Sequence, residues 1–362
     1  MREATIRLGI IGLNHGLELL RRVGRLEGVQ VVAACAPSWR KYSNILDEAG
    51  VCGFGCPQDM MARGDLDGVI LAPPTPILAQ TAMACARAGI PLLVEKPMAC
   101  TVGEGISLLE ECLAYKAPIL VGYHRRYSVP VLALKDQLRS GRLGRILGVQ
   151  CVWAVRKPDA YFQQPWRIIP NGGGPLMINI CHEIDLLRFL LGEIREVSAC
   201  LSDAGRGNQV EDSGVVSLVF QDGAMASLFF SDATPSPCSY EATVHENPRI
   251  HPMEGNCYSF FGTRGSITFP GLEIFRYQDE LSGNWLHELD AMKMSVGAED
   301  PLLAELHHFI DVIRHGEAPR VGGPEGLMNL IVVEAIKLAW LEHRSVRLEE
   351  IIGTLNPAFV AT

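Results

Sequence analysis

The sequence predicts an α/β protein in which a doubly wound parallel sheet is followed by a second domain with a large, open and mainly antiparallel sheet. Over the first third of the chain, short apolar runs alternate with helical stretches, as in β–α–β units. From residue 123 onward, runs rich in β-branched and aromatic residues follow one another across short turns. The 362 residues also exceed the length of a common single domain. We therefore predict one domain over residues 1–122 and a second over residues 123–362.

Five apolar runs in the first domain have the length of buried strands: Ile6–Leu13, Val29–Cys35, Val69–Ala72, Leu92–Val94 and Ile119–Val121. The segments between them are long enough for right-handed crossovers, which makes the strands parallel within one sheet. Two helix starts are predicted in this domain. Thr75 is expected to be an N-cap before Pro76, and Thr101 with Glu104 to form a capping box.

The second domain is expected to contain a helix near residues 131–140, a strand near 146–155 and a helix over 175–191. Strands are predicted over 214–220, 224–230, 258–261, 266–269 and 274–277, and two helices near 301–315 and 324–343 close the chain. The runs 215–220 and 224–230 are apolar on both faces of the pleat. Since a sheet with one solvated face alternates polar and apolar residues, we expect a second subunit to cover one face, giving a homodimer or homotetramer.

The composition argues against several classes of protein. A net charge of −9 without a basic tract disfavours nucleic acid as a partner. No apolar run reaches the ~18 residues of a membrane span, and the N-terminus leaves no room for a signal peptide. The eleven cysteines are scattered singly, and they form no metal-binding pattern with the ten histidines. We expect a cytoplasmic protein with free thiols, no metal, and a small molecule as its substrate.

A turn suited to a dinucleotide follows the first strand. Gly12 matches the first glycine of the pattern Gly-x-Gly-x-x-Gly, whereas Asn14 stands at the second glycine and Leu17 at the third. Asn tolerates left-handed backbone conformations, and Gly16 stands one residue before the third position. Gly12, Asn14 and His15 are therefore candidates to bind a pyrophosphate at a helix N-terminus. A tight turn without a ligand would give the same pattern.

The end of the second strand bears on the choice of cofactor. An acidic residue usually binds the ribose of NAD at this place, but the sequence has Ala36 there. Ser38, Arg40 and Lys41 follow, and a hydroxyl with two cations suits the 2′-phosphate of NADP through charge-assisted hydrogen bonds. NADP(H) is therefore the preferred cofactor, with NAD(H) possible. The alternative is that Arg40 and Lys41 belong to a solvated helix start.

Two further residues are catalytic candidates. Lys96 follows a buried run in Glu95-Lys96-Pro97, at the carboxyl edge of the sheet where α/β proteins hold ligands. His182 follows the run Asn171-Gly172-Gly173-Gly174 and lies, on a helical wheel, opposite the apolar stripe of its helix. At this point a solvated lysine and a surface histidine remain alternatives.

Five ordered motifs resemble the Gfo/Idh/MocA family, the glucose-fructose oxidoreductase and inositol dehydrogenase group of nicotinamide-dependent dehydrogenases. They are Ala72-Pro73-Pro74-Thr75, Glu95-Lys96-Pro97, Gly122-Tyr123-His124-Arg125-Arg126, Trp166-Arg167, and the glycine run leading to His182-Glu183-Ile184-Asp185. The resemblance covers nearly the whole chain. It implies a Rossmann domain joined to an α/β domain with an open antiparallel sheet.

The resemblance also implies roles for individual residues. Lys96 would lie near the nicotinamide and hold the reacting oxygen of the substrate, and His182 would be the proton-transfer partner. His124 and Arg126 would stand close to the nicotinamide or the substrate. The remaining cofactor-binding candidates are Pro73, Thr75, Glu95, Trp166 and Arg167.

The sequence departs from the family at one position of the site. Many sugar dehydrogenases that resemble it have an Asp four residues before the histidine, where this chain has Ile178. In its place, Asn179 and His124 are candidates to bind a different substrate, and Asp185 is a candidate to bind substrate or to orient the imidazole. A substrate less hydroxylated than inositol, or an acidic one, fits this change.

Together these features predict an NADP(H)-preferring oxidoreductase that transfers hydride between nicotinamide and a secondary alcohol or carbonyl of a sugar, cyclitol or related acid. The alternative is a non-catalytic NAD(P)-binding sensor of the same fold, which the altered glycine turn and the missing Asp support. A third option is a glycosidase-like enzyme with tightly held NAD, and the lack of an acidic residue at Ala36 disfavours it.

Overall fold

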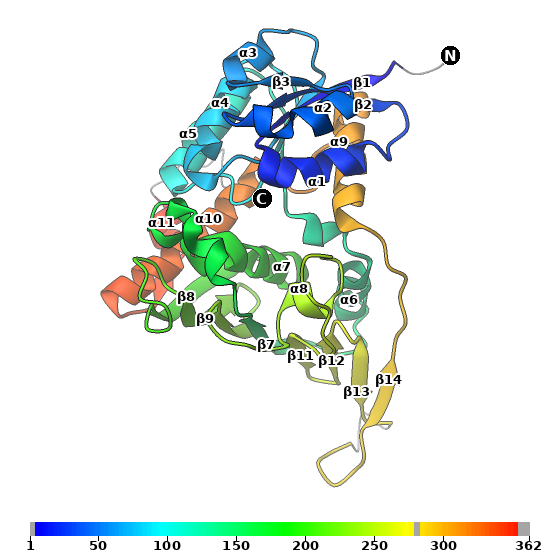
Figure 1. Ribbon diagram of the computed structural model, residues 1–362. Helices are drawn as coiled ribbons and strands as arrows, with labels where there is room; N and C mark the ends of the chain where they lie inside the picture. The colour runs from blue at the N-terminus through cyan, green and yellow to red at the C-terminus, as the bar shows by residue number, and fades with distance from the viewer. Residues whose placement is uncertain (1–3, 279–282, 354–362) are drawn as a thin grey trace. The chain divides into compact units, whose positions relative to one another are not determined.

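The structure, a computed structural model, describes residues 4–278 and 283–353 (Figure 1). Contacts divide the chain into two compact units. The first runs to His124 and takes in Leu302–Leu330, and the second contains Arg125–Pro301 and the described residues from Ile331 to Gly353. The predicted division differs, because it assigned all residues beyond 122 to the second domain. Helix α9 (Pro301–His315) returns to the first unit, where its apolar side chains join the hydrophobic core. No local pattern signals such a return.

The first unit is built on a six-stranded parallel sheet with the order β3-β2-β1-β4-β5-β6, which confirms the doubly wound fold class. Its strands are β1 (Ile6–Ile11), β2 (Val29–Cys35), β3 (Cys52–Phe54), β4 (Gly68–Leu71), β5 (Leu92–Val94) and β6 (Ile119–Val121). The five predicted strands are all present. Strand β3 was not predicted, because three residues with a central glycine carry no strand signal.

Helices cover this sheet. Helix α1 (Leu13–Val23) shares one hydrophobic cluster with β1 and α9. Helices α3 (Pro57–Met61), α4 (Thr75–Ala86) and α5 (Val102–Ala114) lie side by side (Figure 1). The 3₁₀ turn η1 (Trp39–Tyr42) and helix α2 (Ser43–Glu48) connect β2 to β3.

One predicted helix start is confirmed and the other is wrong. The backbone N–H of Glu104 donates to Thr101 Oγ1 at 3.2 Å, so Thr101 caps the helix as predicted. The reciprocal bond of the capping box differs, because Glu104 Oε2 accepts from the N–H of Cys100 at 2.9 Å instead of that of Thr101. Thr75 is the first residue of α4 rather than its cap. Pro74 occupies the cap position, and the buried Thr75 side chain does not bond the helix end.

The second unit is built on a nine-stranded sheet with the order β14-β13-β12-β11-β7-β10-β9-β8-β15. Its strands are β7 (Ile146–Ala154), β8 (Ile194–Ser202), β9 (Ser213–Phe220), β10 (Met225–Ser231), β11 (Tyr258–Gly262), β12 (Ser266–Phe269), β13 (Glu273–Arg276), β14 (Asp290–Lys293) and β15 (Val346–Arg347). Neighbours are antiparallel except β7 and β10, which are parallel. Strands β8, β14 and β15 were not predicted. Strand β8 contains charged residues near its start, β14 is exposed along its whole length, and β15 has only two residues.

The helical parts of this unit begin with η2 (His124–Tyr127) and α6 (Val129–Arg139). Later come η3 (Asp159–Gln163), η4 (Pro165–Ile168), the π-turn η5 (Leu176–Ile180), α7 (Cys181–Leu191), α8 (Tyr240–Thr243) and α11 (Glu349–Ile352). Helix α10 (Gly323–Glu342) is divided between the units, and its residues from Ile331 onward belong to this one. Helix α7 is buried on nearly every side and lies over the sheet (Figure 1).

The other sheet face carries exposed apolar side chains, which we call the open sheet face. Its members lie on neighbouring strands: Val215 (49% exposed), Met225 (58%), Phe229 (41%) and Phe261 (45%). On the opposite face of β9 and β10, Val216, Leu218, Leu228 and Phe230 are buried. Both pleat faces of β9 and β10 thus carry apolar side chains, with Ser217 and Ser227 between them on the open sheet face, and only one face is covered within a single chain. Within the described ranges, every helix is too short or too polar to cross a lipid bilayer.

Candidate active site

The first turn brings Gly12 against the end of β4. Gly12 has a φ of 91°, and a Cβ atom on it would clash with the carbonyl oxygen of Ala72, so glycine is required here. A Cβ on Gly16 would lie 2.7 Å from the Ile10 side chain, so Gly16 provides the close helix–strand packing of a third glycine. The turn therefore keeps side chains away from the N-terminus of α1, as a cradle for a pyrophosphate requires.

The segment after β2 reaches the same turn. The hydroxyl of Tyr42 donates to Asn14 Oδ1 at 3.2 Å. Trp39 packs flat on Gly53 of β3, and the guanidinium of Arg40 lies 4.9 Å from the centre of the Trp39 ring. The predicted phosphate ligands Ser38, Arg40 and Lys41 are all exposed. Tyr42 and Trp39 were not singled out from the sequence, because neither belongs to a recognised motif.

His15 is a cation within the turn. Its Nε2 lies 3.1 Å from Glu95 Oε1, and its Nδ1 lies 3.6 Å from Glu18 Oε2. Burial alone lowers the pKa of His15, but the charges of these two carboxylates and their hydrogen bonds outweigh burial and raise the pKa to about 9. The imidazole is therefore protonated at neutral pH, and its charge is matched by the carboxylates of Glu95 and Glu18.

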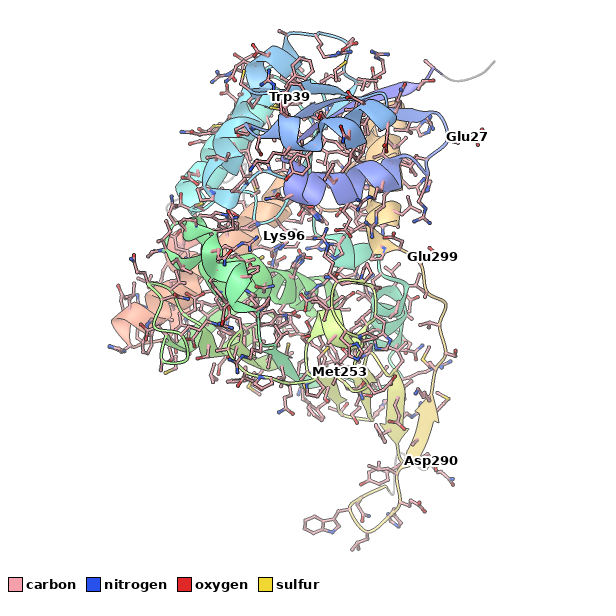
Figure 2. All side chains as sticks on the ribbon, viewed as in Figure 1. Glu27, Trp39, Lys96, Met253, Asp290 and Glu299 are labelled. Atoms are coloured by element: carbon pink, nitrogen blue, oxygen red, sulfur yellow. The ribbon has the colours of Figure 1, made fainter. Side chains whose placement is uncertain are left out.

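Glu95 is the centre of a charged edge at the end of β5. Burial favours its neutral form, but His15, Lys96 and His124 outweigh burial and hold the pKa of this carboxyl below its usual value. Lys96 is half-buried on the loop after β5 (Figure 2), and its backbone N–H donates to Glu95 Oε2 at 3.3 Å. Three basic side chains thus surround one carboxylate.

Two more predicted residues lie at this edge. Pro73 and Thr75 are buried in the connection from β4 to α4, and the backbone of Pro73 packs against Gly12. The first unit therefore gathers the predicted residues of β1, β4, β5 and β6 where these parallel strands end, which is where such sheets hold ligands.

In the second unit, Arg126 and Asp185 bind each other. The guanidinium donates from Nε to Asp185 Oδ2 at 2.9 Å and from Nη2 to Oδ1 at 2.6 Å, and both side chains are buried. Such a bidentate pair is strong and geometrically specific. Two predicted substrate-binding residues thus neutralise one another, so Arg126 does not offer a net positive charge to an acidic substrate.

Arg125 holds two carboxylates beside this pair. Its Nη1 donates to Glu183 Oε1 at 2.6 Å and its Nη2 to Glu241 Oε1 at 2.7 Å, while Trp153 Nε1 donates to Glu241 Oε2 at 2.8 Å. Burial raises the pKa of Glu183 to about 7, with Arg125 opposing the rise and Glu241 adding to it. The cluster anchors Glu183, and hence the first turn of α7, against the sheet.

His182 lies in that first turn, and its side chain is 5% exposed. The preceding residues, Leu176–Ile180, form a π-turn instead of the predicted continuous α-helix. Because a π-turn closes hydrogen bonds from residue i to i+5, the wheel drawn for an α-helix does not hold across it. The wheel holds only within α7, where His182 and Asp185 keep their predicted spacing, and Ile178 does not stand one α-helical turn before His182.

Asn179, within the π-turn, is bound by a lysine that the sequence analysis missed. Lys157 Nζ donates to Asn179 Oδ1 at 2.7 Å and lies 3.3 Å from Asp232 Oδ2. Arg206 Nε donates to the other oxygen of Asp232 at 2.8 Å. In the sequence, Arg156-Lys157-Pro158 looks like a solvated loop, and only the fold places Lys157 beside the turn that leads to His182.

Trp166 and Arg167 lie in the 3₁₀ turn η4. Arg167 Nη1 donates to the carbonyl oxygen of Tyr161 at 2.8 Å, and its guanidinium stacks 3.8 Å from the centre of the Tyr161 ring. The glycine run packs directly on this turn, since a Cβ on Gly173 would lie 2.6 Å from the carbonyl oxygen of Trp166. The run's glycines thus allow the backbone before α7 to approach the predicted cofactor-binding residues.

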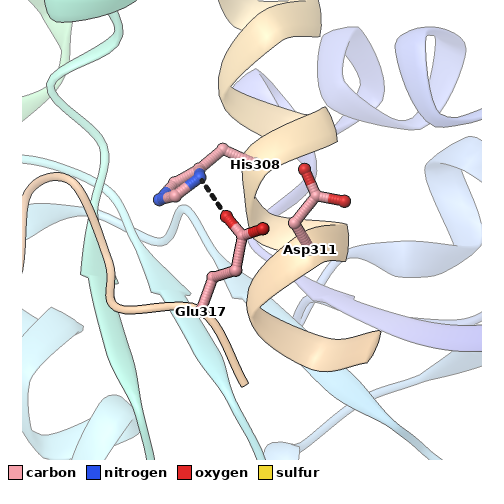
Figure 3. A group of neighbouring side chains, drawn as sticks. All are labelled: His308, Asp311 and Glu317. Atoms are coloured by element: carbon pink, nitrogen blue, oxygen red, sulfur yellow. Dashed lines mark ion pairs between the residues drawn. The ribbon is translucent and has the colours of Figure 1, made fainter. Parts of the chain in front are cut away.

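One group of potential metal ligands occurs among the described residues, in the first unit (Figure 3). His308 Nδ1 lies 3.8 Å from Glu317 Oε2, with Asp311 beside them. His308 Nε2 accepts the backbone N–H of Arg320 at 2.9 Å, so a neutral imidazole carries its proton on Nδ1. Neither nitrogen then has a lone pair to give to a metal, and we interpret the group as a surface cluster in which the neutral imidazole faces the Glu317 carboxylate.

Comparisons with known proteins agree with this architecture. A sequence model of the oxidoreductase family with an NAD-binding Rossmann fold matches residues 6–123, and one of the GFO/IDH/MocA C-terminal domain matches residues 131–268. The chain is 31% identical over 303 residues to inositol 2-dehydrogenase from Rhodococcus erythropolis, covering 79% of this chain and 76% of that protein. It is 25% identical over 366 residues to myo-inositol 2-dehydrogenase from Thermotoga maritima, covering 98% of this chain and 100% of that one.

A solved structure has the same fold. An oxidoreductase from Agrobacterium radiobacter, in complex with NAD+, L-tartaric acid and magnesium, matches 96% of this chain and 100% of its own with a TM-score of 0.81, at 18% identity. The Rossmann-fold model matches the predicted first domain, and the C-terminal-domain model matches part of the predicted second domain. The chain therefore belongs to the GFO/IDH/MocA family of oxidoreductases with an NAD-binding Rossmann fold.

Proposed function

We propose that this protein is an NADP(H)-preferring dehydrogenase or reductase that transfers hydride between nicotinamide and a secondary alcohol or carbonyl of a neutral sugar or cyclitol. Its family membership makes it an oxidoreductase of CH–OH groups. One observation carries the assignment of its residues. The Glu95 carboxylate, surrounded by His15, Lys96 and His124, stands at the end of β5 and is joined through His15 to the Gly12 turn.

The first unit has features that fit a dinucleotide. Gly12 lets the turn pass against the backbone of Ala72 and Pro73, where any Cβ would clash, and the His15 imidazolium stands in the first turn of the helix that follows. When bound, the nicotinamide supplies the acceptor or donor of hydride. The absence of a carboxylate at Ala36 and the exposed Ser38, Arg40 and Lys41 support the 2′-phosphate of NADP over NAD.

The catalytic roles follow from chemistry available on each unit. The Lys96 ammonium donates to the substrate oxygen and stabilises its alkoxide character, and Glu95 beside it keeps the lysine in place. His182 exchanges the hydroxyl proton with the substrate, since an imidazole suits reversible transfer near neutral pH. Trp166 and Arg167 contribute to cofactor binding in this proposal.

A neutral substrate is favoured over an acidic one. Arg126 is cancelled by Asp185, and Arg167 is already stacked on Tyr161. The Asn179 amide keeps its NH₂ group for a substrate hydroxyl, because its oxygen is the atom that Lys157 binds. The names of the relatives, inositol 2-dehydrogenases, agree with a polyol.

The test is turnover with a panel of neutral sugars and cyclitols. The purified full chain is mixed with NADP or NAD and each polyol, and formation of reduced nicotinamide is followed by its ultraviolet absorbance. We expect reduction of NADP with at least one polyol and a lower KM for NADP than for NAD. A sensor without catalysis would bind cofactor and give no turnover with any member of the panel.

We further propose a homodimer or homotetramer assembled through the open sheet face. A contiguous apolar surface is costly to leave in water, and Met225 and Phe229 are its most prominent members on β10. The eleven cysteines are all free thiols, four exposed or partly exposed and seven buried, which supports a reducing compartment such as the cytoplasm.

A further inference from the structure

A cavity of about 420 Å³ lies within the second unit. Neither Lys96 nor His182 lines it. Its walls come from the end of β8, the connection from β8 to β9, the glycine run and the last turns of α10. Six side chains give it its chemistry: Asp203, Asn208, Gln209, Glu211, Lys337 and Trp340. Its volume is in the range of small-molecule sites.

These side chains are available to a ligand. Lys337 is half-buried, and its ammonium makes no hydrogen bond or ion pair with any residue of the described ranges, interacting only through its charge with Glu211. Within the same ranges, the side-chain amides of Asn208 and Gln209 have no hydrogen-bond partner either. The half-buried Trp340 makes one aromatic contact, edge-on with His343 at 5.6 Å between ring centres.

The charges of the cavity select against an anion. The cavity is lined by one ammonium group, that of Lys337, and by the two carboxyl groups of Asp203 and Glu211. Burial raises the pKa of Glu211, while the backbone N–H of Leu176 and the charge of Lys337 oppose the rise. An aromatic platform with planar amides, carboxylates and one amine offers both donors and acceptors. Hydroxyl groups need both, and the apolar face of a sugar ring packs on an indole.

The cavity is joined to the backbone that leads to the proposed active site. Glu211 Oε1 accepts the N–H of Leu176 at 2.8 Å, at the start of the π-turn before His182. Gly173 lines the cavity and also packs on the carbonyl oxygen of Trp166. The backbone N–H of Gln209 donates to the carbonyl oxygen of Ile168 at 3.2 Å. A ligand here would therefore contact the same segment that positions Trp166 and His182.

We propose that this cavity is a second binding site for a neutral polyhydroxylated ring, a sugar or cyclitol, and that its occupancy orders the glycine run. Trp340 packs against the ring, Asn208 and Gln209 bind hydroxyls, and Lys337 donates to a hydroxyl or ring oxygen. The inference rests on the cavity's own side chains and not on the catalytic assignment.

The test uses the full chain without cofactor, labelled with 5-fluorotryptophan and followed by ¹⁹F NMR. The chain has five tryptophans, and Trp340→Phe assigns the resonance of interest. The probes are myo-inositol, D-glucose and the acidic D-glucuronate. We expect the neutral probes to shift the Trp340 resonance in a saturable way, and hydrogen exchange of the Leu176 amide to slow when they are bound.

Variants locate the site. Gln209→Leu and Lys337→Met should each weaken binding about tenfold, as expected for one lost hydrogen bond to the ligand. Lys293→Met, an exposed lysine of β14, is the matched control and should change nothing. His182→Asn should leave the Trp340 response intact, so failure of the proposed reaction and failure of this site are distinguishable.

Three results would overturn the proposal. The first is no shift of the Trp340 resonance with either neutral probe at high millimolar concentration. The second is a Trp340 response in the Gln209→Leu and Lys337→Met variants that equals that of the wild type, which would show that these two side chains do not bind the ligand. The third is tighter binding of D-glucuronate than of D-glucose, which would contradict the neutral class of ligand.

Discussion

The His15 imidazole lies 3.1 Å from the Glu95 carboxylate, which joins the turn after β1 to the loop that carries Lys96. Because the pKa of His15 rises from 6.5 to about 9, this histidine is cationic throughout the physiological range. A proposed cofactor-binding turn and a proposed catalytic loop are thus held together by one ion pair. Because the charge state of this pair depends on pH, we expect cofactor binding and catalysis, as proposed, to change at high pH.

The first prediction concerns that pH dependence. A raised pKa in the folded state contributes stability that is complete below the unfolded value of 6.5 and is lost as pH rises through about 9. The stability advantage of the wild type over His15→Gln should therefore be largest near pH 6 and disappear near pH 10, in urea unfolding at a series of about five pH values. NMR titration of the imidazole gives an independent reading, and Glu95→Gln should bring its pKa down toward 6.5. An unchanged His15 pKa in that variant would contradict the pairing.

The second prediction concerns the proposed catalytic pair. Lys96→Ala and His182→Asn should each lower kcat/KM by about 100-fold or more, since proton-transfer groups commonly supply 10² to 10⁴. Steady-state kinetics with the best polyol of the panel measure this. Cofactor binding, followed by protein fluorescence, should change little for His182→Asn. Turnover retained at the wild-type level in Lys96→Ala would rule out its assigned role.

The third prediction concerns cofactor choice. Ala36→Asp puts a carboxylate at the end of β2, where it would repel a 2′-phosphate and accept from the ribose hydroxyls of NAD. The preference for NADP over NAD, as a ratio of kcat/KM values, should fall by about tenfold to 100-fold, which corresponds to about 1.5 to 3 kcal/mol in charged hydrogen bonds. Arg40→Ala should shift the ratio in the same direction. A wild-type preference for NAD would refute the assignment outright.

The fourth prediction concerns the buried pair of Arg126 and Asp185. Asp185→Ala leaves an uncompensated buried guanidinium and should destabilise the second unit by about 3 to 5 kcal/mol. The double variant Arg126→Met with Asp185→Leu should recover much of that loss, because it removes both charges. Glu342→Ala, which breaks an exposed ion pair with Arg344, is the control and should cost at most about 1 kcal/mol. Urea unfolding followed by circular dichroism measures all three, and equal costs for Asp185→Ala and the double variant would argue against the charge-based account.

The fifth prediction concerns assembly. Met225→Glu with Phe229→Glu puts two charges on the open sheet face and should convert the oligomer to monomers in size-exclusion chromatography with light scattering. Leu113→Glu, at a 68% exposed position of α5, serves as a matched control that keeps the oligomer. A wild-type protein that is monomeric at micromolar concentration would contradict the proposed oligomer.

Local sequence determined a large part of this protein. Gly12 specifies its turn, because only glycine adopts its backbone without a clash. Thr101 and Glu104 specify the start of α5 through an N-cap hydrogen bond between residues three positions apart. The parallel strands β1, β2 and β5 follow from apolar runs bounded by turn residues. These features depend on interactions between neighbours in the chain, which a pattern records directly.

Tertiary structure decided what the predicted residues are able to do. Arg126 and Asp185 stand 59 positions apart in sequence, and only the fold makes them neutralise each other. The fold also places Lys157 where its ammonium binds the Asn179 side chain. It packs α9 into a hydrophobic core whose other residues lie more than 170 positions earlier in the chain. The π-turn before His182 changed which side chains share a face with it. Charges and packing act through space, and a pattern of neighbours carries no record of which distant groups will meet.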